Sequence, residues 1–138
     1  MSSFVYSKWL ENRLIGAGPD ITSTTVKAYL VRTGSGHYVA NQSTDQFLSA
    51  IASGDRLASF TLSSKTTTLG VFDAADGAFP TVGGTDPGGA IVVVRDTGTD
   101  TSSELMCYID DYAGLPVTPN GQDINVVWAN DSNKIYKV

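Results

Sequence analysis

The sequence predicts a small, mainly β domain: an antiparallel β-sandwich or barrel-like fold with one or two short helices, near the N-terminus and near residues 44–53. The chain has 138 residues, the length of one domain, and 41% hydrophobic residues, enough for a packed core. Thr, Ser and Gly, which favour strands and turns, contribute 15, 14 and 14 residues. Short apolar segments separated by turn residues every 8 to 12 positions are typical of sandwiches and barrels.

The first element expected is a helix over residues 4–15, because apolar residues recur there at helical spacing and Gly16 is suited to end it. The apolar stripe consists of Phe4, Trp9, Leu10 and Leu14. We therefore divide the chain into an N-terminal helical or anchor segment, residues 1–16, and a single β-rich domain, residues 17–138. The first strand is expected at residues 24–32, where apolar residues on both faces indicate that both faces are partly covered.

A second short helix is expected near residues 44–53. Ser43 stands three positions before Gln46, which is the spacing of a capping box, and Gly54 is placed to close the element. The rest of the chain alternates between apolar segments and turn residues. These segments predict six further strands, at residues 57–62, 66–72, 90–95, 105–110, 123–129 and 134–138.

Composition limits the possible functions. The single cysteine, Cys107, cannot form an intrachain disulfide, and no Cys/His cluster suggests zinc, so no metal or other cofactor is expected. A net charge of -5 with scattered basic residues argues against binding to nucleic acid. No apolar run has the roughly 18 residues needed to span a membrane. The first residues lack the pattern of a signal peptide, so we expect synthesis in a cytoplasm.

Three motifs suggest chemistry, and each has a plainer interpretation. Asp96-Thr97-Gly98 follows an apolar run, as in retroviral-type aspartic proteases, but its polar continuation favours an ordinary hairpin tip. His37 lies in a Gly/Ser-rich loop without a nucleophile motif, which favours a loop histidine. Cys107 has apolar neighbours, which favours a buried thiol. The acidic groups Asp96, Asp100, Glu104 and Asp110, Asp111 lack EF-hand spacing. We expect no enzyme activity.

Contact surfaces remain the best candidates for function, because apolar and aromatic residues gather near the start of the chain and in a late loop. The candidate residues for an interface with a partner or with another copy are Phe4, Tyr6, Trp9, Tyr112, Leu115 and Pro116. If the first segment is the anchor, deletion of residues 1–15 is expected to abolish binding and to leave a folded β domain.

Residues 93–138 point to a family. The hairpin VVRDTGTDTSSELMCYID, the loop GLPVTPNGQDI, the strand with Trp128 and the ending NKIYKV resemble small virion structural proteins of tailed bacteriophages. Upstream, TTVKAYLVRT, DQFLSAI and TLGVFDAADGAFPTV fit the same family, so the resemblance covers roughly residues 8–138.

The resemblance implies a capsid decoration or cement protein that binds the major capsid protein lattice on the outer head surface and stabilises it. It implies a virion location after synthesis in the host cytoplasm, a homo-oligomer (a trimer, by analogy with other decoration proteins) and no catalytic residues. An alternative is a tail- or fibre-associated module that recognises a host surface glycan through loops 33–43 and 112–122, with Tyr38, Tyr112 and Asn120 contacting the sugar.

Overall fold

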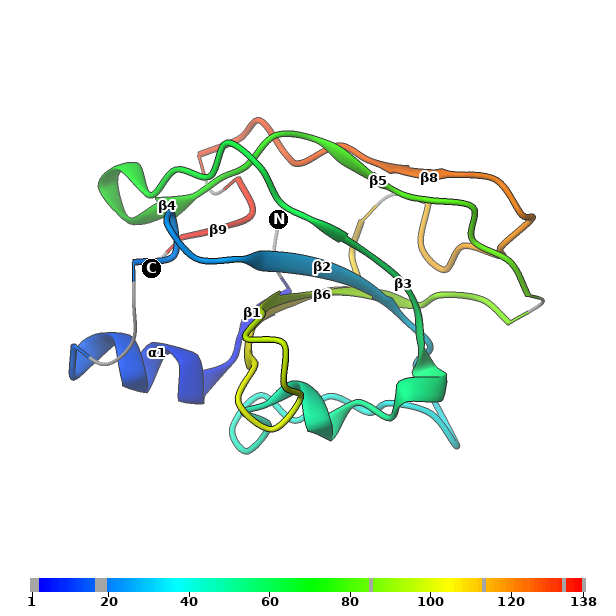
Figure 1. The fold of residues 1–138 in the computed structure, drawn as a ribbon, viewed down its shortest axis with the longest axis horizontal. Helices are drawn as coiled ribbons and strands as arrows, with labels where there is room; N and C mark the ends of the chain where they lie inside the picture. The colour runs from blue at the N-terminus through cyan, green and yellow to red at the C-terminus, as the bar shows by residue number, and fades with distance from the viewer. Residues whose placement is uncertain (1–2, 17–19, 85, 113, 133, 138) are drawn as a thin grey trace.

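A five-stranded antiparallel sheet forms the centre of the protein (Figure 1). The computed structural model describes residues 3–16, 20–84, 86–112, 114–132 and 134–137. The strand order is β1-β7-β6-β2-β3, with bounds Phe4–Val5, Glu104–Ile109, Ala90–Arg95, Val26–Val31 and Arg56–Thr61. Two small ribbons accompany it: β4 (Val71–Phe72) pairs with β9 (Tyr136–Lys137), and β5 (Gly77–Phe79) pairs with β8 (Ile124–Val126). The predicted fold class, a small antiparallel β domain, is confirmed.

The central sheet is covered on both faces. The ribbons β4–β9 and β5–β8 lie above it in Figure 1, while α1 (Ser7–Leu14) and two 3₁₀ turns, Leu48–Ala50 and Ser53–Asp55, lie below. This explains why every residue of β7 and the first five residues of β6 are buried. A strand covered on both sides needs apolar side chains at successive positions, and the run Ile91 to Val94 provides them.

The N-terminal segment differs from the predicted helix over residues 4–15. Phe4 and Val5 form a strand paired with Tyr108 and Cys107, and the helix occupies only Ser7–Leu14. Strand pairing prevails because it gives hydrogen-bond partners to the edge of β7, as when the Tyr6 amide donates to the Met106 carbonyl oxygen. Within the helix only Trp9 is buried. The predicted apolar stripe is therefore wrong for Leu14, which is 84% exposed.

The helix predicted near residues 44–53 does not form. The Asn41 side-chain oxygen accepts hydrogen bonds from the Ser43 and Thr44 amides, so Asn41, and not Ser43, organises this turn. The chain then runs extended along the edge of β7, where the Leu105 amide donates to the Gln46 carbonyl oxygen. Only the two 3₁₀ turns follow, because long-range pairing with β7 uses the backbone groups that a helix would need.

The strand predicted at 90–95 is confirmed as β6 with the same bounds, and most of the other strand predictions are confirmed with shifted or shorter bounds. Residues 24–32 contain β2 and residues 57–62 overlap β3, whereas residues 66–72 contain a 3₁₀ turn, Thr68–Gly70, and the short β4. The strands predicted at 105–110, 123–129 and 134–138 correspond to β7, β8 and β9. Sequence patterns missed β5, which begins at a glycine. The proposed boundary between residues 16 and 17 falls beside residues 17–19, outside the described residues.

Candidate interaction surfaces

A loop that follows β7 holds half of the predicted interface residues in a fixed position. The Tyr112 carbonyl oxygen accepts a hydrogen bond from the Leu115 amide, and the Leu115–Pro116 peptide bond is cis. Val117 exchanges two backbone hydrogen bonds with Gly88, at 2.8 and 2.9 Å. The Tyr112 hydroxyl also accepts a bond from the Val127 amide, at 3.0 Å. The loop is therefore attached both to the segment before β6 and to the segment after β8.

This loop borders a small apolar cavity of about 200 Å³, which we call the loop pocket. Its floor consists of the fully buried side chains Leu30, Phe79, Ile91 and Val126. Its rim consists of the partly buried residues Tyr112, Leu115, Val117 and Ile124, with Gly114 and a single side-chain amide, that of Asn125. An apolar cavity of this size has little affinity for water and suits one apolar side chain of a partner.

Pro116 is exposed and follows Leu115 in the chain, but it does not line the loop pocket. Val127, which is half exposed, adds apolar surface where β8 ends. The structure thus brings Tyr112 and Leu115 to one rim, with Pro116 next to them in the chain. Sequence analysis did not identify the floor of the pocket, because its residues come from four strands that are far apart in the chain.

The aromatic residues near the N-terminus lie elsewhere, and two of them are core residues. Trp9 is 1% exposed, and its indole N–H donates to the Tyr136 hydroxyl at 3.0 Å. Tyr6 is fully buried, and its hydroxyl is 2.8 Å from that of Tyr38, which donates to Asp45. Tyr6 and Trp9 therefore have no free surface to offer a partner, since pairing of β1 with β7 draws them into the core.

Phe4 is half buried, and its ring stacks on Tyr108 with centroids 4.9 Å apart. Phe4 borders a shallow cavity of about 340 Å³ that Val39 also lines. This cavity does not include Tyr112, Leu115 or Pro116. Deleting residues 1–15 would thus remove a strand and two core side chains. The expectation that this deletion leaves a folded β domain conflicts with this packing.

Burial also affects the ionisation of these hydroxyls. Desolvation raises the pKa of Tyr136 to about 12, although the hydrogen bond from Trp9 opposes this shift. Desolvation likewise raises the pKa of both Tyr6 and Tyr38. These groups stay neutral at physiological pH and act as hydrogen-bonding links inside the core.

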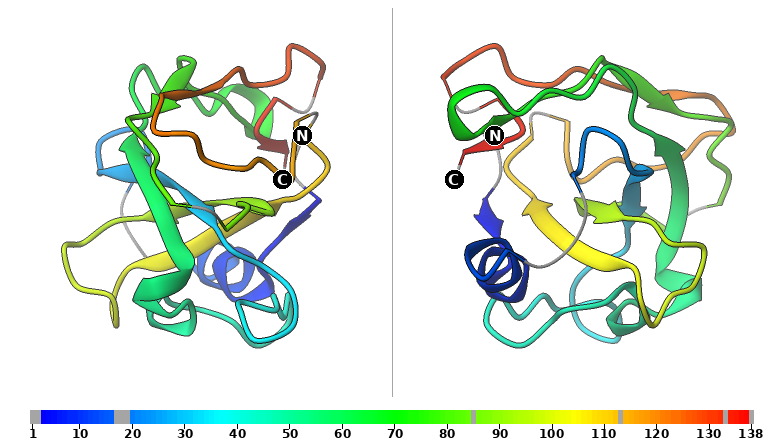
Figure 2. Two further views of the ribbon diagram at one scale, coloured as in Figure 1. Left: turned by 90° about the vertical axis from the view of Figure 1, so that its right-hand side faces the viewer. Right: turned by 60° about the vertical axis from the view of Figure 1, so that its left-hand side comes forward.

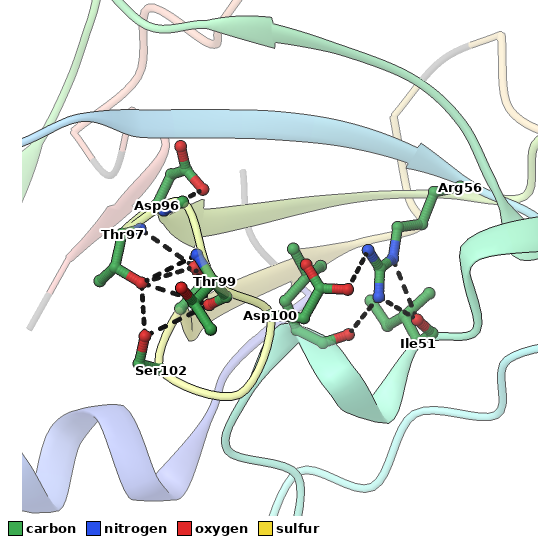
Figure 3. Close-up of polar contacts among 10 residues, drawn as sticks. Ile51, Arg56, Asp96, Thr97, Thr99, Asp100 and Ser102 are labelled. Atoms are coloured by element: carbon green, nitrogen blue, oxygen red, sulfur yellow. Dashed lines mark hydrogen bonds and ion pairs between the residues drawn. The ribbon is translucent and has the colours of Figure 1, made fainter.

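The Asp96-Thr97-Gly98 segment forms the tip of the β6–β7 hairpin, as predicted (Figure 3). The Asp96 carboxylate accepts the Gly98 amide and pairs with Lys27 at 3.4 Å. The Thr97 hydroxyl is 2.6 Å from that of Ser102, which braces the turn. Each of these contacts joins neighbouring parts of the hairpin or fastens it to β2, so they explain the shape of the tip.

The acidic residues of the hairpin have cationic partners within the chain. Figure 3 shows Arg56 reaching both Asp100, at 2.9 Å, and the Ile51 carbonyl oxygen. Glu104 is buried and pairs with Arg95 at 2.7 Å. In the described part of the chain, no three His, Cys, Asp or Glu side chains gather as a metal site would require.

The two remaining side chains with reactive groups, His37 and Cys107, have partners or neighbours within the chain. His37 lies in a loop, with its Nδ1 3.0 Å from Asp55 and its Nε2 3.1 Å from the Arg32 guanidinium. Cys107 is buried, as predicted, and desolvation raises the pKa of its thiol to about 12. Of the described helices, none is long and apolar enough to cross a membrane.

The residues suggested for glycan binding are likewise engaged within the chain. Tyr38 is 6% exposed and its hydroxyl contacts Tyr6 and Asp45, while the Tyr112 hydroxyl accepts the Val127 amide. The Asn120 side-chain oxygen accepts the Gln122 amide. The described contacts therefore give no specific support to a sugar site at these three residues.

Comparison with known proteins adds no relative. No protein-family model matches the chain, and no curated protein is significantly similar to it. The resemblance to phage virion proteins therefore stays a prediction.

Proposed function

We propose that this protein is a structural, non-catalytic component of a phage particle, a decoration or cement protein that binds the major capsid protein lattice on the outer head surface and stabilises it. The resemblance of residues 93–138 suggests the kind of partner. The loop pocket is the structural observation that carries the proposal, because Gly114, Leu115, Val117 and Ile124 of its rim belong to GLPVTPNGQDI, part of the resembling region.

The loop pocket has the properties of an anchoring site. Its floor is apolar, and its rim is tied to two other segments by hydrogen bonds. Binding to it would therefore require little ordering of the loop, which favours affinity. A single apolar side chain of the capsid protein that enters the pocket would act as a hot spot, with Tyr112, Leu115 and Pro116 excluding water around it.

The net charge of the chain is compatible with a role as a decoration protein. A net charge of -5 disfavours non-specific association of free copies before they meet the capsid. Many identical copies would then occupy equivalent lattice positions, so the number bound at saturation should follow the symmetry of the head.

Co-sedimentation with capsids that lack the protein tests this function. Saturation at a large, symmetry-related copy number is expected, whereas absence of binding by the wild-type chain would refute the proposal. Leu115→Asp should weaken binding at least tenfold, because it places a charge at an apolar rim. Val39→Asp is the matched control, since Val39 is 71% exposed but does not border the loop pocket. Equal weakening by both variants would contradict the assignment of this surface.

A further inference from the structure

A second apolar surface lies at one end of the molecule, and neither the predicted interface nor the loop pocket includes it. Three large side chains are exposed there: Leu69 at 91%, Leu14 at 84% and Ile15 at 73%. Leu14 and Ile15 mark the C-terminal end of α1, and Leu69 lies in the 3₁₀ turn Thr68–Gly70. Both elements lie on the left side of the right-hand view of Figure 2, α1 below and the turn above. We call these three residues the end patch.

A cavity of about 240 Å³ opens beside the end patch. Its floor consists of the buried side chains Ile21, Phe72 and Tyr136. Its rim includes Arg13, which directly precedes Leu14, and Thr67 and Gly70, which flank the turn with Leu69. Asp20 completes the rim, and its pKa is lowered by hydrogen bonds from the Thr22 hydroxyl and amide. The cavity thus has an apolar floor and a rim with one positive and one negative group.

The backbone presents Leu69 in an unusual way. Its φ of 55° and ψ of 35° lie in the left-handed region, which is unfavourable for leucine, and the following Gly70 also has a positive φ. Glycine or asparagine would adopt this conformation at less cost. The chain nevertheless has a large apolar side chain there, directed to solvent. The exposed Leu69 side chain therefore adds nothing to the core of its own copy, although its backbone conformation is costly.

We propose that the end patch binds a second copy of this chain, with Leu69 of each copy entering the cavity of the other. Knob and cavity lie at the same end of the molecule, so a two-fold rotation makes both insertions at once. Arg13 and Asp20 of one rim already attract each other, and Arg13 lies over the Trp9 ring, so the apolar insertion and not a new ion pair would hold the dimer. A cavity of about 150 Å³ already accommodates benzene, so about 240 Å³ is sufficient for a leucine side chain.

The two surfaces are separate. The loop pocket adjoins β5 and β8, whereas the end patch adjoins α1, β4 and β9 at the opposite end of the long axis in Figure 1. A dimer formed through the end patch would leave the loop pocket accessible. Self-association can therefore be tested on the purified chain without capsids, and its outcome does not depend on the proposed function.

Sedimentation equilibrium over a range of concentrations tests the proposal. The wild-type chain should reach twice its monomer mass of 14.6 kDa. Leu69→Gly should raise the dimer dissociation constant by about a hundredfold or more, since two buried leucine side chains are lost per dimer. This variant also relieves the backbone strain, so it should remain folded. Val39→Gly is the control, because Val39 is exposed outside the end patch and should leave the dissociation constant unchanged.

A monomer or a trimer at all concentrations, or a dimer that Leu69→Gly leaves unchanged, would overturn the proposal. So would a monomeric wild-type chain whose Leu69→Gly variant loses capsid binding, because the end patch would then face the capsid.

Discussion

Replacing Trp9 with alanine should remove a large part of the stability of this domain. The side chain is 1% exposed, its indole N–H donates to the Tyr136 hydroxyl, and the Arg13 guanidinium lies 4.5 Å from its ring centroid. Truncating a buried tryptophan costs about 3–5 kcal/mol. The orphaned Tyr136 hydroxyl places the cost near the upper limit, about 5 kcal/mol. A domain of this size is stable by about 5–15 kcal/mol, so Trp9→Ala should remove between about a third and all of that stability.

Urea unfolding at pH 7, followed by circular dichroism, measures this cost. Trp9→Phe keeps most of the apolar contact but loses the hydrogen bond, and should cost about 1–3 kcal/mol, so it reports on the same site if the alanine variant does not fold. Lys8→Ala in the same helix is the control, since the exposed Lys8–Glu11 pair contributes at most about 0.5 kcal/mol. A loss below about 1 kcal/mol for Trp9→Ala would refute the integration of the N-terminal segment into the core.

Three further predictions concern stability. Because the pKa of Cys107 rises from 9.0 to about 12 and that of Tyr136 from 10.0 to about 12 on folding, the unfolded chain releases these protons first. The free energy of unfolding should therefore fall as pH rises from about 9 to 12, by about 1.4 kcal/mol per pH unit for each group. Urea unfolding of Cys107→Ala should show a smaller fall than the wild-type chain between pH 9 and 10. An unchanged fall in this variant would contradict the prediction. Glu104→Ala leaves the partly buried Arg95 guanidinium without its carboxylate and should cost about 3 kcal/mol by urea unfolding, whereas a cost below about 1 kcal/mol would show that water replaces the pair. Leu69→Gly should keep or raise the melting temperature of the monomer, by a gain of about 1 kcal/mol, and a clear loss would mean that Leu69 is not strained.

Sequence patterns predicted the fold class where local and long-range preferences agree. Apolar residues on both faces of residues 24–32 predicted a strand covered on both sides, and no residue of β2 is exposed in the structure. The sequence patterns gave wrong predictions where long-range strand pairing overrides a local helix signal. The capping-box spacing of Ser43 and Gln46 is real, but the edge of β7 recruits the Gln46 carbonyl oxygen into sheet pairing.

The residues of the candidate interaction surface could be predicted from the sequence only in part. Composition flagged Tyr112, Leu115 and Pro116 as apolar residues in a late loop, and the structure leaves them at or near the surface. The same reasoning flagged Tyr6 and Trp9, which the structure buries. Apolar character alone does not distinguish a core residue from a contact residue. That distinction depends on which distant strand lies beside each side chain, such as β7 beside β1.

The hydrogen bond between Trp9 and Tyr136 joins residues 127 positions apart and so bears on how the chain folds. β1 likewise pairs with residues more than a hundred positions later. Contacts of such high sequence separation slow folding, because the intervening chain must lose entropy before they form. During synthesis, Trp9 cannot reach its final environment until Tyr136 has left the ribosome. The growing chain must therefore keep apolar surface exposed until Tyr136 emerges, and chaperone binding to nascent chains should persist until then.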